Sequence, residues 1–285
     1  MVTAPTVARE LYVGNRNANP EEWFPFEYPR WSKEPGKDMI AFGELMYFRP
    51  GDTGSLMCGL WRTGPNMPGI LDTGRAHFPY SNPYGDETCL ILEGETVLTV
   101  QQTQKRYHLK AGDIFSHPRD LDVWWEPQAP YFKKFWTISD GPNRNAQQDD
   151  LFIGNIAGNS SKWDAFQLDD PNYGTQEVGE QLTIRSVGAT GSLHVGLWRA
   201  GRGLPGCDSS GAAQFKSSTS RGDESVMVLE GEASVTNQDT GVKHHFKAGD
   251  IFSIVKGTNL VWETTGPFFK KYAVIADEAR PQTAV

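Results

Sequence analysis

Short runs of large apolar residues, separated by Gly, Pro and Asp, follow one another closely along most of the chain. In the first half these runs occupy residues 44–49, 54–62, 87–92, 96–101, 105–109, 113–117, 122–126 and 131–138. Each run has the length of a strand, and turn-forming residues stand between consecutive runs. Gly94 and Gly112 suit tight turns that require a positive φ. The pattern predicts an all-β fold, either a sandwich or a barrel.

The second half of the chain repeats this pattern. Its runs occupy residues 180–185, 191–199, 224–229, 233–237, 242–246, 250–254, 259–263 and 268–275. The sequence Gly-Leu-Trp-Arg at 59–62 returns at 196–199, and the segment 85–95 matches 222–232, in both cases 137 positions later. This period is far above the roughly 20–50 residues of solenoid repeats, so it indicates two tandem domains with the same fold.

A polar, turn-rich segment separates the two repeats and marks the domain boundary. We expect an N-terminal tail at 1–10, a first domain at 11–140, a linker at 141–150, a second domain at 151–278 and a C-terminal tail at 279–285.

Within the first domain, prolines alternate with aromatic residues at 20–31. Prolines at this density exclude a helix, whereas so many aromatic residues are unlike a disordered tail. This segment, the aromatic arm, is therefore expected to be extended and packed across a domain face.

Charge and composition narrow the possible partners and the cellular location. The formal net charge is −8, and no basic cluster is present, so nucleic acids and anionic membrane surfaces are poor candidate partners. Residues 1–10 lack the apolar core of a secretory signal, and no apolar run approaches the length of a membrane span. We therefore expect a cytoplasmic protein. Cys58, Cys89 and Cys207 have no counterpart cysteine in the other repeat, which argues against a disulfide framework or a zinc cluster.

Glycine and glutamate positions in each half resemble the motifs of the cupin superfamily. They are Gly74, Glu87, Gly94 and Gly112 with Pro118 in the first half, and Gly211, Glu224, Gly231, Gly249 and Gly257 in the second. The chain thus looks like a bicupin, and the resemblance implies two tandem double-stranded β-helix barrels of the jelly-roll type. The fragments Trp125-Glu126 and Lys134-Phe135, which recur in the second half, are similar to the branch that includes ethanolamine-utilisation and ureidoglycine aminohydrolase-like proteins.

The same resemblance implies a metal site whose ligands this sequence lacks. A typical cupin holds Mn, Fe, Ni or Zn with three histidines and one glutamate. The histidine positions hold other residues: Tyr80, Asn82 and Val123 in the first half, and Ser217, Thr219 and Leu260 in the second. Only the glutamates, Glu87 and Glu224, remain. We therefore expect that neither barrel binds a metal ion, and that the protein uses no cofactor.

The first barrel is the candidate active site. If Glu87 points inward, as in the family, desolvation would raise its pKa and suit it to act as a general base near neutral pH. Tyr80 would be the acid or the orienting donor. The two residues are the expected catalytic pair of a metal-independent isomerase, lyase or hydrolase. The alternative interpretation is a relic glutamate with a structural hydrogen bond.

Further residues of the first repeat are candidates for substrate binding: Asn82, Trp61, Arg62, His77, His117 and Trp125. An arginine beside a flat tryptophan could meet a carboxylate with two hydrogen bonds. Each candidate also has a structural interpretation, as an aromatic plug at a barrel mouth, a solvated arginine or a satisfied histidine.

Two other functions stay open, and both have a small molecule as the partner. One is a non-catalytic barrel that binds this molecule. The other is a metal-dependent oxygenase or hydrolase with the atypical ligands Glu87, His77 and His117. Because many cupins dimerise by exchanging terminal strands, the aromatic arm and its analogue at 160–173 could lie between the subunits of a homodimer or between the two barrels.

Overall fold

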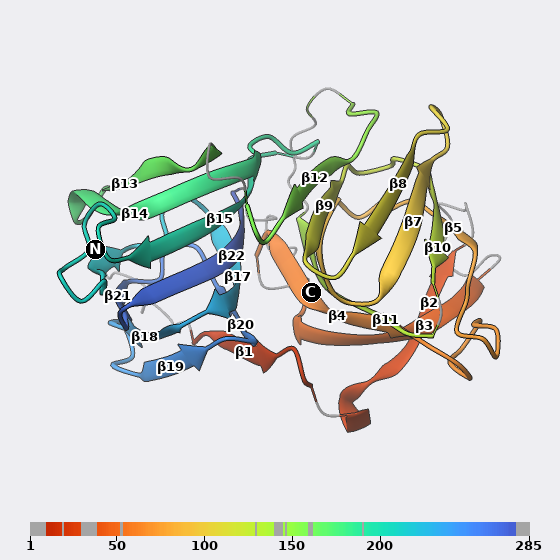
Figure 1. Cartoon of the computed structure of the whole chain (residues 1–285), viewed down its shortest axis with the longest axis horizontal. Helices are drawn as coiled ribbons and strands as arrows, with labels where there is room; N and C mark the ends of the chain where they lie inside the picture. The colour runs from red at the N-terminus through yellow and green to blue at the C-terminus, as the bar shows by residue number, and fades with distance from the viewer. Residues whose placement is uncertain are drawn as a thin grey trace, which may run out of the picture.

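The computed structural model describes residues 10–18, 20–29, 39–51, 54–128, 130–139, 145, 147–158, 162–189 and 191–277. The regular elements include a short 3₁₀ turn, η1 (Pro20–Glu22), and the strands β1 to β22. The strands form two bodies that lie side by side (Figure 1). No helix in the described part of the chain is long and apolar enough to cross a membrane. The predicted all-β fold of two tandem barrels is confirmed.

The N-terminal barrel consists of a seven-stranded and a four-stranded sheet. In spatial order, the larger sheet contains β12 (Phe152–Asn155), β9 (Asp113–His117), β6 (Asp86–Glu93), β11 (Phe132–Ser139), β4 (Leu56–Thr63), β3 (Met39–Arg49) and β2 (Phe24–Pro29). The smaller sheet contains β5 (Phe78–Tyr80), β10 (Val123–Pro127), β7 (Glu95–Val100) and β8 (Arg106–Lys110). Side chains from both sheets meet in one apolar core, which includes Trp61, Phe115 and Trp125.

The C-terminal barrel has the same construction. Its larger sheet contains β1 (Tyr12–Asn15), β20 (Asp250–Ile254), β17 (Asp223–Glu230), β22 (Phe268–Ala276), β15 (Leu193–Gly201), β14 (Gly174–Arg185) and β13 (Asp164–Asp170). Its smaller sheet contains β16 (Gln214–Ser217), β21 (Leu260–Thr264), β18 (Glu232–Asn237) and β19 (Lys243–Lys247). The interior of this barrel is a second core, which includes Trp198, Phe252 and Trp262.

The two repeats exchange their first strands. β1 pairs antiparallel with β20, with Tyr12 opposite Ser253, so the first strand of the chain lies in the sheet of the C-terminal barrel. β12 pairs in the same way with β9, with Phe152 opposite Ser116. Each of the two expected domains therefore completes the larger sheet of the other, and this exchange occurs within one chain.

The aromatic arm pairs within its own barrel. β2 lies antiparallel to β3, and the analogous strand β13 lies antiparallel to β14. Residues 30, 31, 160 and 161 of the two arms lie outside the described residues. From Phe24 on, the arm extends a sheet of its own repeat as expected, but its first residues, Pro20–Glu22, form the 3₁₀ turn η1 and not an extended segment.

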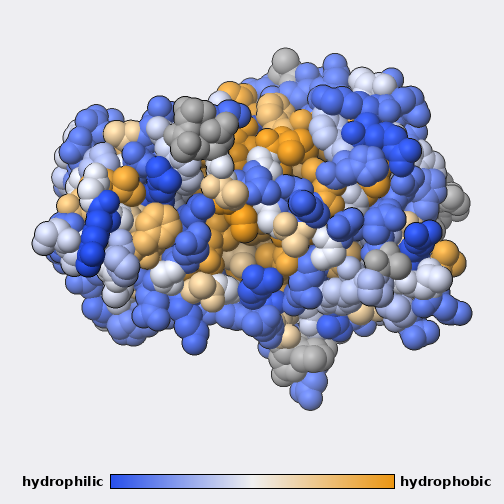
Figure 2. Space-filling view, in the orientation of Figure 1, coloured by the Kyte–Doolittle hydropathy of each residue, from blue (hydrophilic) through white to orange (hydrophobic). Residues whose placement is uncertain are grey.

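The larger sheets pack against each other through their outer faces. Figure 2 shows apolar surface where the two bodies meet. The buried side chains of the interface include Leu60, Leu90 and Phe135 from the N-terminal barrel and Leu197, Met227 and Tyr272 from the C-terminal barrel. β6 and β11 are buried along nearly their whole length, because one face lines a barrel and the other face lies in this interface. That double burial explains why their sequences read as almost continuous apolar runs.

Two buried ion pairs cross the same interface. Arg49 lies 2.9 Å from Asp223, and Arg185 lies 2.9 Å from Asp86. Each pair joins the end of a strand in one repeat to the first residue of β17 or β6 in the other repeat. The repeat therefore places both pairs at matching positions, and each charge removed from water has a partner of opposite sign.

Candidate functional site

Glu87 points into the N-terminal barrel and is bound there by two side chains. The hydroxyl of Tyr80 donates a hydrogen bond of 2.6 Å to its Oε2 atom. The ammonium group of Lys134 donates one of 2.7 Å to its Oε1 atom. The side chains of Glu87 and Lys134 are only 3% and 7% exposed. The ammonium group also lies 4.3 Å from the centre of the Trp125 ring, in a cation–π contact.

This arrangement changes the expected acidity of Glu87. Burial by itself raises the pKa of the carboxyl group, but the charge of Lys134 and the hydrogen bonds from Lys134 and Tyr80 outweigh it, so the pKa lies below its ordinary value. Burial lowers the pKa of Lys134, and the neighbouring Cys89 and Glu87 more than reverse this, so that pKa is raised. The expectation of a raised pKa for Glu87 was wrong, because it did not include a lysine inside the barrel.

Three of the expected binding residues share this interior. Trp61 and Trp125 are buried, with their ring centres 5.9 Å apart. His117 lies opposite Glu87 on β9, with its ring centre 5.7 Å from that of Tyr80. Neither ring nitrogen of His117 has a hydrogen-bond partner among the described residues. Burial lowers the pKa of this histidine to about 4, so its ring is neutral at pH 7.

The other three expected binding residues do not face Glu87. The His77 side chain is 57% exposed, stacks on Trp124 and lies 3.5 Å from Glu126. Arg62 pairs with Glu44 at 2.6 Å and covers the Trp23 ring on the outside of the sheet. Asn82 is buried in the loop after β5, where its Oδ1 atom accepts a hydrogen bond from the backbone N–H of Tyr84. Arg62 therefore does not share the interior with Trp61, and its guanidinium group is held by Glu44.

The C-terminal barrel repeats the glutamate–lysine pair. Lys271 donates a hydrogen bond of 2.7 Å to Oε1 of Glu224 and lies 4.1 Å from the centre of the Trp262 ring. The Glu224 and Lys271 side chains are 14% and 9% exposed, so this pair is more open than its N-terminal counterpart. The tyrosine that holds Glu87 has no equivalent here, because Ser217 stands at that position of the repeat.

A cavity of about 70 Å³ lies beside this second pair. Its apolar walls include Phe166, Leu168, Trp198, Phe215 and Trp262. Small residues explain why this barrel is hollow. Ser217 and Ala273 line the cavity, and the matching positions of the N-terminal barrel hold the buried Tyr80 and Trp136. The larger side chains fill the corresponding space with an aromatic core.

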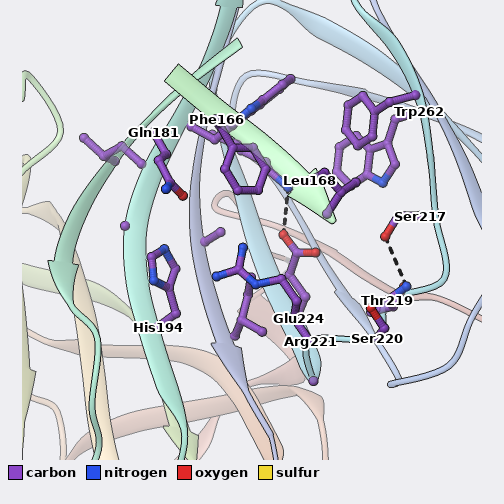
Figure 3. A pocket seen from close by; sticks show the side chains of 18 residues that line it. Phe166, Leu168, Gln181, His194, Ser217, Thr219, Ser220, Arg221, Glu224 and Trp262 are labelled. Carbon is purple, nitrogen blue, oxygen red and sulfur yellow. Dashed lines mark hydrogen bonds and ion pairs between the residues drawn. The ribbon is translucent and has the colours of Figure 1, made fainter. Parts of the chain in front are cut away.

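The cavity also contains polar groups without protein partners. Figure 3 shows His194, Arg221 and Glu224 together on one side, with Trp262 on the other. Arg221 is exposed at the opening, and its guanidinium group lies over the Phe166 ring, 5.7 Å from the ring centre. Gln181 and His194 also line the cavity, and neither makes a protein hydrogen bond within the described residues. Burial, and then the nearby charge of Arg221, lower the pKa of His194 to about 4.

A family model described as the EutQ-like cupin domain matches the chain in two segments, residues 60–136 and 209–272. One segment lies in each barrel, at matching positions of the repeat. The chain is a bicupin. Among curated proteins, no sequence matches it.

Solved structures share the fold of this bicupin at low sequence identity. A Pseudomonas syringae pv. tomato protein of unknown function, from the DUF861 family, has a TM-score of 0.62 and 11% identity, over 93% of this chain and 99% of that one. The protein Ylba from E. coli has a TM-score of 0.59 and 9% identity, over 97% and 95%. A putative glyoxylate induced protein from Pseudomonas aeruginosa has a TM-score of 0.57 and 12% identity, over 100% and 96%. At these identities the likeness concerns the fold alone.

The side chains of this bicupin do not fit the metal site of its superfamily. The described residues contain no group of three or more His, Cys, Asp or Glu that could hold a metal ion. Both oxygens of Glu87 are already bound, one by Lys134 and the other by Tyr80. The atypical set of Glu87, His77 and His117 does not come together, because His77 lies on the outer surface. A lysine ammonium group is the cation next to the family glutamate in both barrels.

Sequence reasoning missed several residues of the bicupin interior. Lys134 and Lys271 were not among the candidate site residues, although alternation along β11 and β22 places them on the inward face with Trp136 and Ala273. The occurrence of a lysine at the same position of both repeats could have pointed to a role inside the barrels. Arg221 was harder to identify. It stands where the first repeat has Tyr84, in a loop, and the alternation that orients side chains in a strand does not apply to a loop.

Proposed function

We propose that this bicupin binds a small polar organic molecule in its C-terminal barrel, with Lys271 in place of a metal ion as the cation beside Glu224. The barrel combines a cavity with a buried ion pair on its wall. Pockets of this kind, apolar with a few convergent polar groups, are typical of small-molecule sites.

One observation carries the proposal: polar side chains that line the cavity lack protein partners. Buried polar groups in folded proteins are nearly always hydrogen-bonded, so unpartnered ones at a cavity indicate that water or a ligand completes them. Gln181 and His194 are half-buried and Arg221 is exposed at the opening, and none of the three makes a hydrogen bond or ion pair within the described residues. In the N-terminal barrel the unpartnered ring nitrogens of His117 lie within an aromatic core, and Leu45 and Met57 stand where the C-terminal barrel has Gln181 and His194.

A cavity-filling substitution tests the proposal. Ala273→Trp introduces the residue that fills the N-terminal barrel, and Val242→Trp adds the same side chain at an exposed position as a control. A library of small metabolites is screened by thermal shift, and hits are measured by calorimetry. We expect compounds that stabilise the wild type and Val242→Trp but not Ala273→Trp.

Folding of Ala273→Trp is checked by circular dichroism, and Ser217→Tyr provides a second way to fill the cavity. If the hits stabilise both filled variants as well as they stabilise the wild type, the ligand does not bind in this cavity and the proposal fails.

A second candidate function is metal-independent acid–base catalysis in the N-terminal barrel. The observation that favours it is the contact of Glu87 with Tyr80 at 2.6 Å, beside the Cys89 thiol, which donates to Oε1 of Glu87 at 3.3 Å. With its lowered pKa, Glu87 would be ionised and therefore present as a base at neutral pH. Isomerisation, elimination or hydrolysis would be the reaction class.

The test of this second function is turnover rather than binding. Mass spectrometry of library compounds incubated with wild type and with Glu87→Gln identifies a product that depends on Glu87. A product formed equally by Glu224→Gln and wild type, but lost in Glu87→Gln, would place the chemistry in the N-terminal barrel. Equal turnover by Glu87→Gln and wild type would remove this candidate.

A further inference from the structure

We propose that the ligand of the C-terminal barrel is a small monocarboxylate, whose carboxylate binds Arg221 at the opening and whose apolar part lies against the aromatic wall. This inference rests on the proposed function, because it specifies the chemical class of the molecule in the same cavity.

The charges of the cavity favour one negative charge on the ligand. Lys271 and Glu224 form an ion pair and neutralise each other. His194 is neutral at pH 7, because its pKa is lowered to about 4. Arg221 is then the remaining charged side chain among the described residues that line the cavity. A monoanion would balance it, whereas a dianion would bring an unpaired charge against a largely apolar wall.

The geometry of Arg221 suits a carboxylate. A guanidinium group presents a planar fork of N–H donors that matches the two oxygens of a carboxylate. Most other arginines near the barrels bind acidic residues, as Arg199 does with Glu180 at 2.5 Å. Arg221 makes no ion pair within the described residues, and its guanidinium group lies 5.7 Å from the centre of the Phe166 ring. Its donors are therefore available to a ligand.

The opposite wall determines the rest of the molecule. Leu168, Trp198, Phe215 and Trp262 offer apolar and aromatic surface, with Phe215 and Trp262 stacked at 5.7 Å. A volume of about 70 Å³ has room for roughly five waters. A ligand that reaches into this space therefore has a short apolar chain or a small ring, and Gln181 is placed to bond a polar substituent.

The experiment compares an acid with its uncharged analogue. Butanoate, butanamide and succinate are titrated into the full-length protein and measured by calorimetry at pH 7.5. We expect butanoate to bind about tenfold or more tightly than butanamide, because a charge-assisted pair is replaced by a neutral contact. Succinate should also bind more weakly than butanoate, since its second carboxylate would face the apolar wall.

Two arginine variants isolate the contact. Arg221→Gln should weaken butanoate binding about tenfold and leave butanamide unchanged. Arg202→Gln removes the same charge from an exposed arginine that donates to the carbonyl of Ser210, and it should leave both affinities unchanged.

The outcomes separate this inference from the proposed function. If butanamide binds as tightly as butanoate, or if the two arginine variants behave alike, the carboxylate assignment is wrong. The same holds if the compounds that distinguish wild type from Ala273→Trp are all uncharged or cationic, and in each of these cases binding in the cavity still stands. If no compound distinguishes wild type from Ala273→Trp, the proposed function itself fails.

Discussion

Lys134 and Glu87 form an ion pair inside the N-terminal barrel, with 2.7 Å between Nζ and Oε1. Lys271 and Glu224 repeat it at the same distance in the C-terminal barrel. In each barrel a tryptophan ring covers the ammonium group. The repeat has therefore kept an internal cation together with its carboxylate, while the side chains around the two pairs differ. Those differences, rather than the pairs, distinguish a filled barrel from a hollow one.

Removing the charge of Lys134 should strongly destabilise the protein. Lys134→Met leaves Glu87 buried without its counter-ion, and breaking a buried pair in this way costs about 3–5 kcal/mol. Urea unfolding at pH 7.5 measures the change. As a control, Lys243→Met breaks an exposed pair with Glu263 and should cost less than about 1 kcal/mol.

The double variant Lys134→Met with Glu87→Gln tests the reason for the loss. It removes both charges, so it should recover much of the stability lost in Lys134→Met. A double variant no more stable than Lys134→Met would show that packing of the lysine against Trp125, and not the unpaired carboxylate, causes the loss.

The stability of the N-terminal barrel should fall as the pH falls from about 6.5 to about 4, because His117 has a lowered pKa. The unfolded chain takes up a proton on this histidine below about pH 6.5, whereas the folded protein does so only near pH 4. The side chains around it are Glu87 and Asp86, which favour the protonated ring, and Lys134, which opposes it. The full effect is about 3 kcal/mol.

His117→Gln isolates this contribution. Urea unfolding of wild type and variant is compared at pH 7.5, 6.0 and 4.5. The stability of the wild type relative to the variant should decrease at each step toward low pH. A difference that stays constant across these three values would contradict the prediction. His108, on the exposed face of β8, provides the control substitution.

The fold could be predicted almost completely from the sequence. Strands were visible as short runs of apolar residues between turn-forming residues, and the duplication was visible as matching residues 137 positions apart. The sequence did not predict the exchange of β1 and β12, since residues 11–15 and 151–155 are similar in sequence and nothing in them specifies one barrel over the other. Which barrel each strand joins depends on which sheet edges are free in the folded protein. The position of the aromatic arm between subunits or barrels was left open for the same reason.

The candidate site was predicted less well, and for a different reason. Strand parity placed Tyr80, Glu87 and Trp125 on the inward face, and the structure brings Tyr80 into contact with Glu87. The alternation of side chains along a strand shows which residues point inward, but it does not show how much space remains inside the barrel. That space depends on the volumes of residues far apart in sequence, such as Ser217 and Ala273, which meet only across the cavity.

Shortening Trp136 should open the N-terminal barrel at the position where the C-terminal barrel is hollow. Trp136→Ala removes a buried aromatic side chain, and such changes cost about 3–5 kcal/mol. The new cavity should bind indole, which replaces the lost ring, so indole should raise the melting temperature of the variant and not of the wild type. A loss below about 1 kcal/mol, or no response to indole, would mean that the core collapses around the substitution.

The buried pair of Arg185 and Asp86 should couple the two barrels. Arg185 belongs to the C-terminal repeat, and it also donates a hydrogen bond of 2.7 Å to Ser116 of the N-terminal barrel. Arg185→Met leaves Asp86 unpaired in the interface, so it should cost about 3–5 kcal/mol in urea unfolding. Because the lost contacts lie between the barrels, limited proteolysis should cleave the variant faster than the wild type.

The matching pair of Arg49 and Asp223 provides the internal comparison. Arg49 donates to Asp223 at 2.9 Å and to Ser253 at 3.0 Å, so Arg49→Met removes the equivalent contacts on the other side of the interface. The two variants should lose similar stability, and combining them should produce two separate unfolding transitions, because each barrel then unfolds without the other. A single cooperative transition in the combined variant would show that the apolar contact of Phe135 with Tyr272 and its neighbours couples the barrels without these charges.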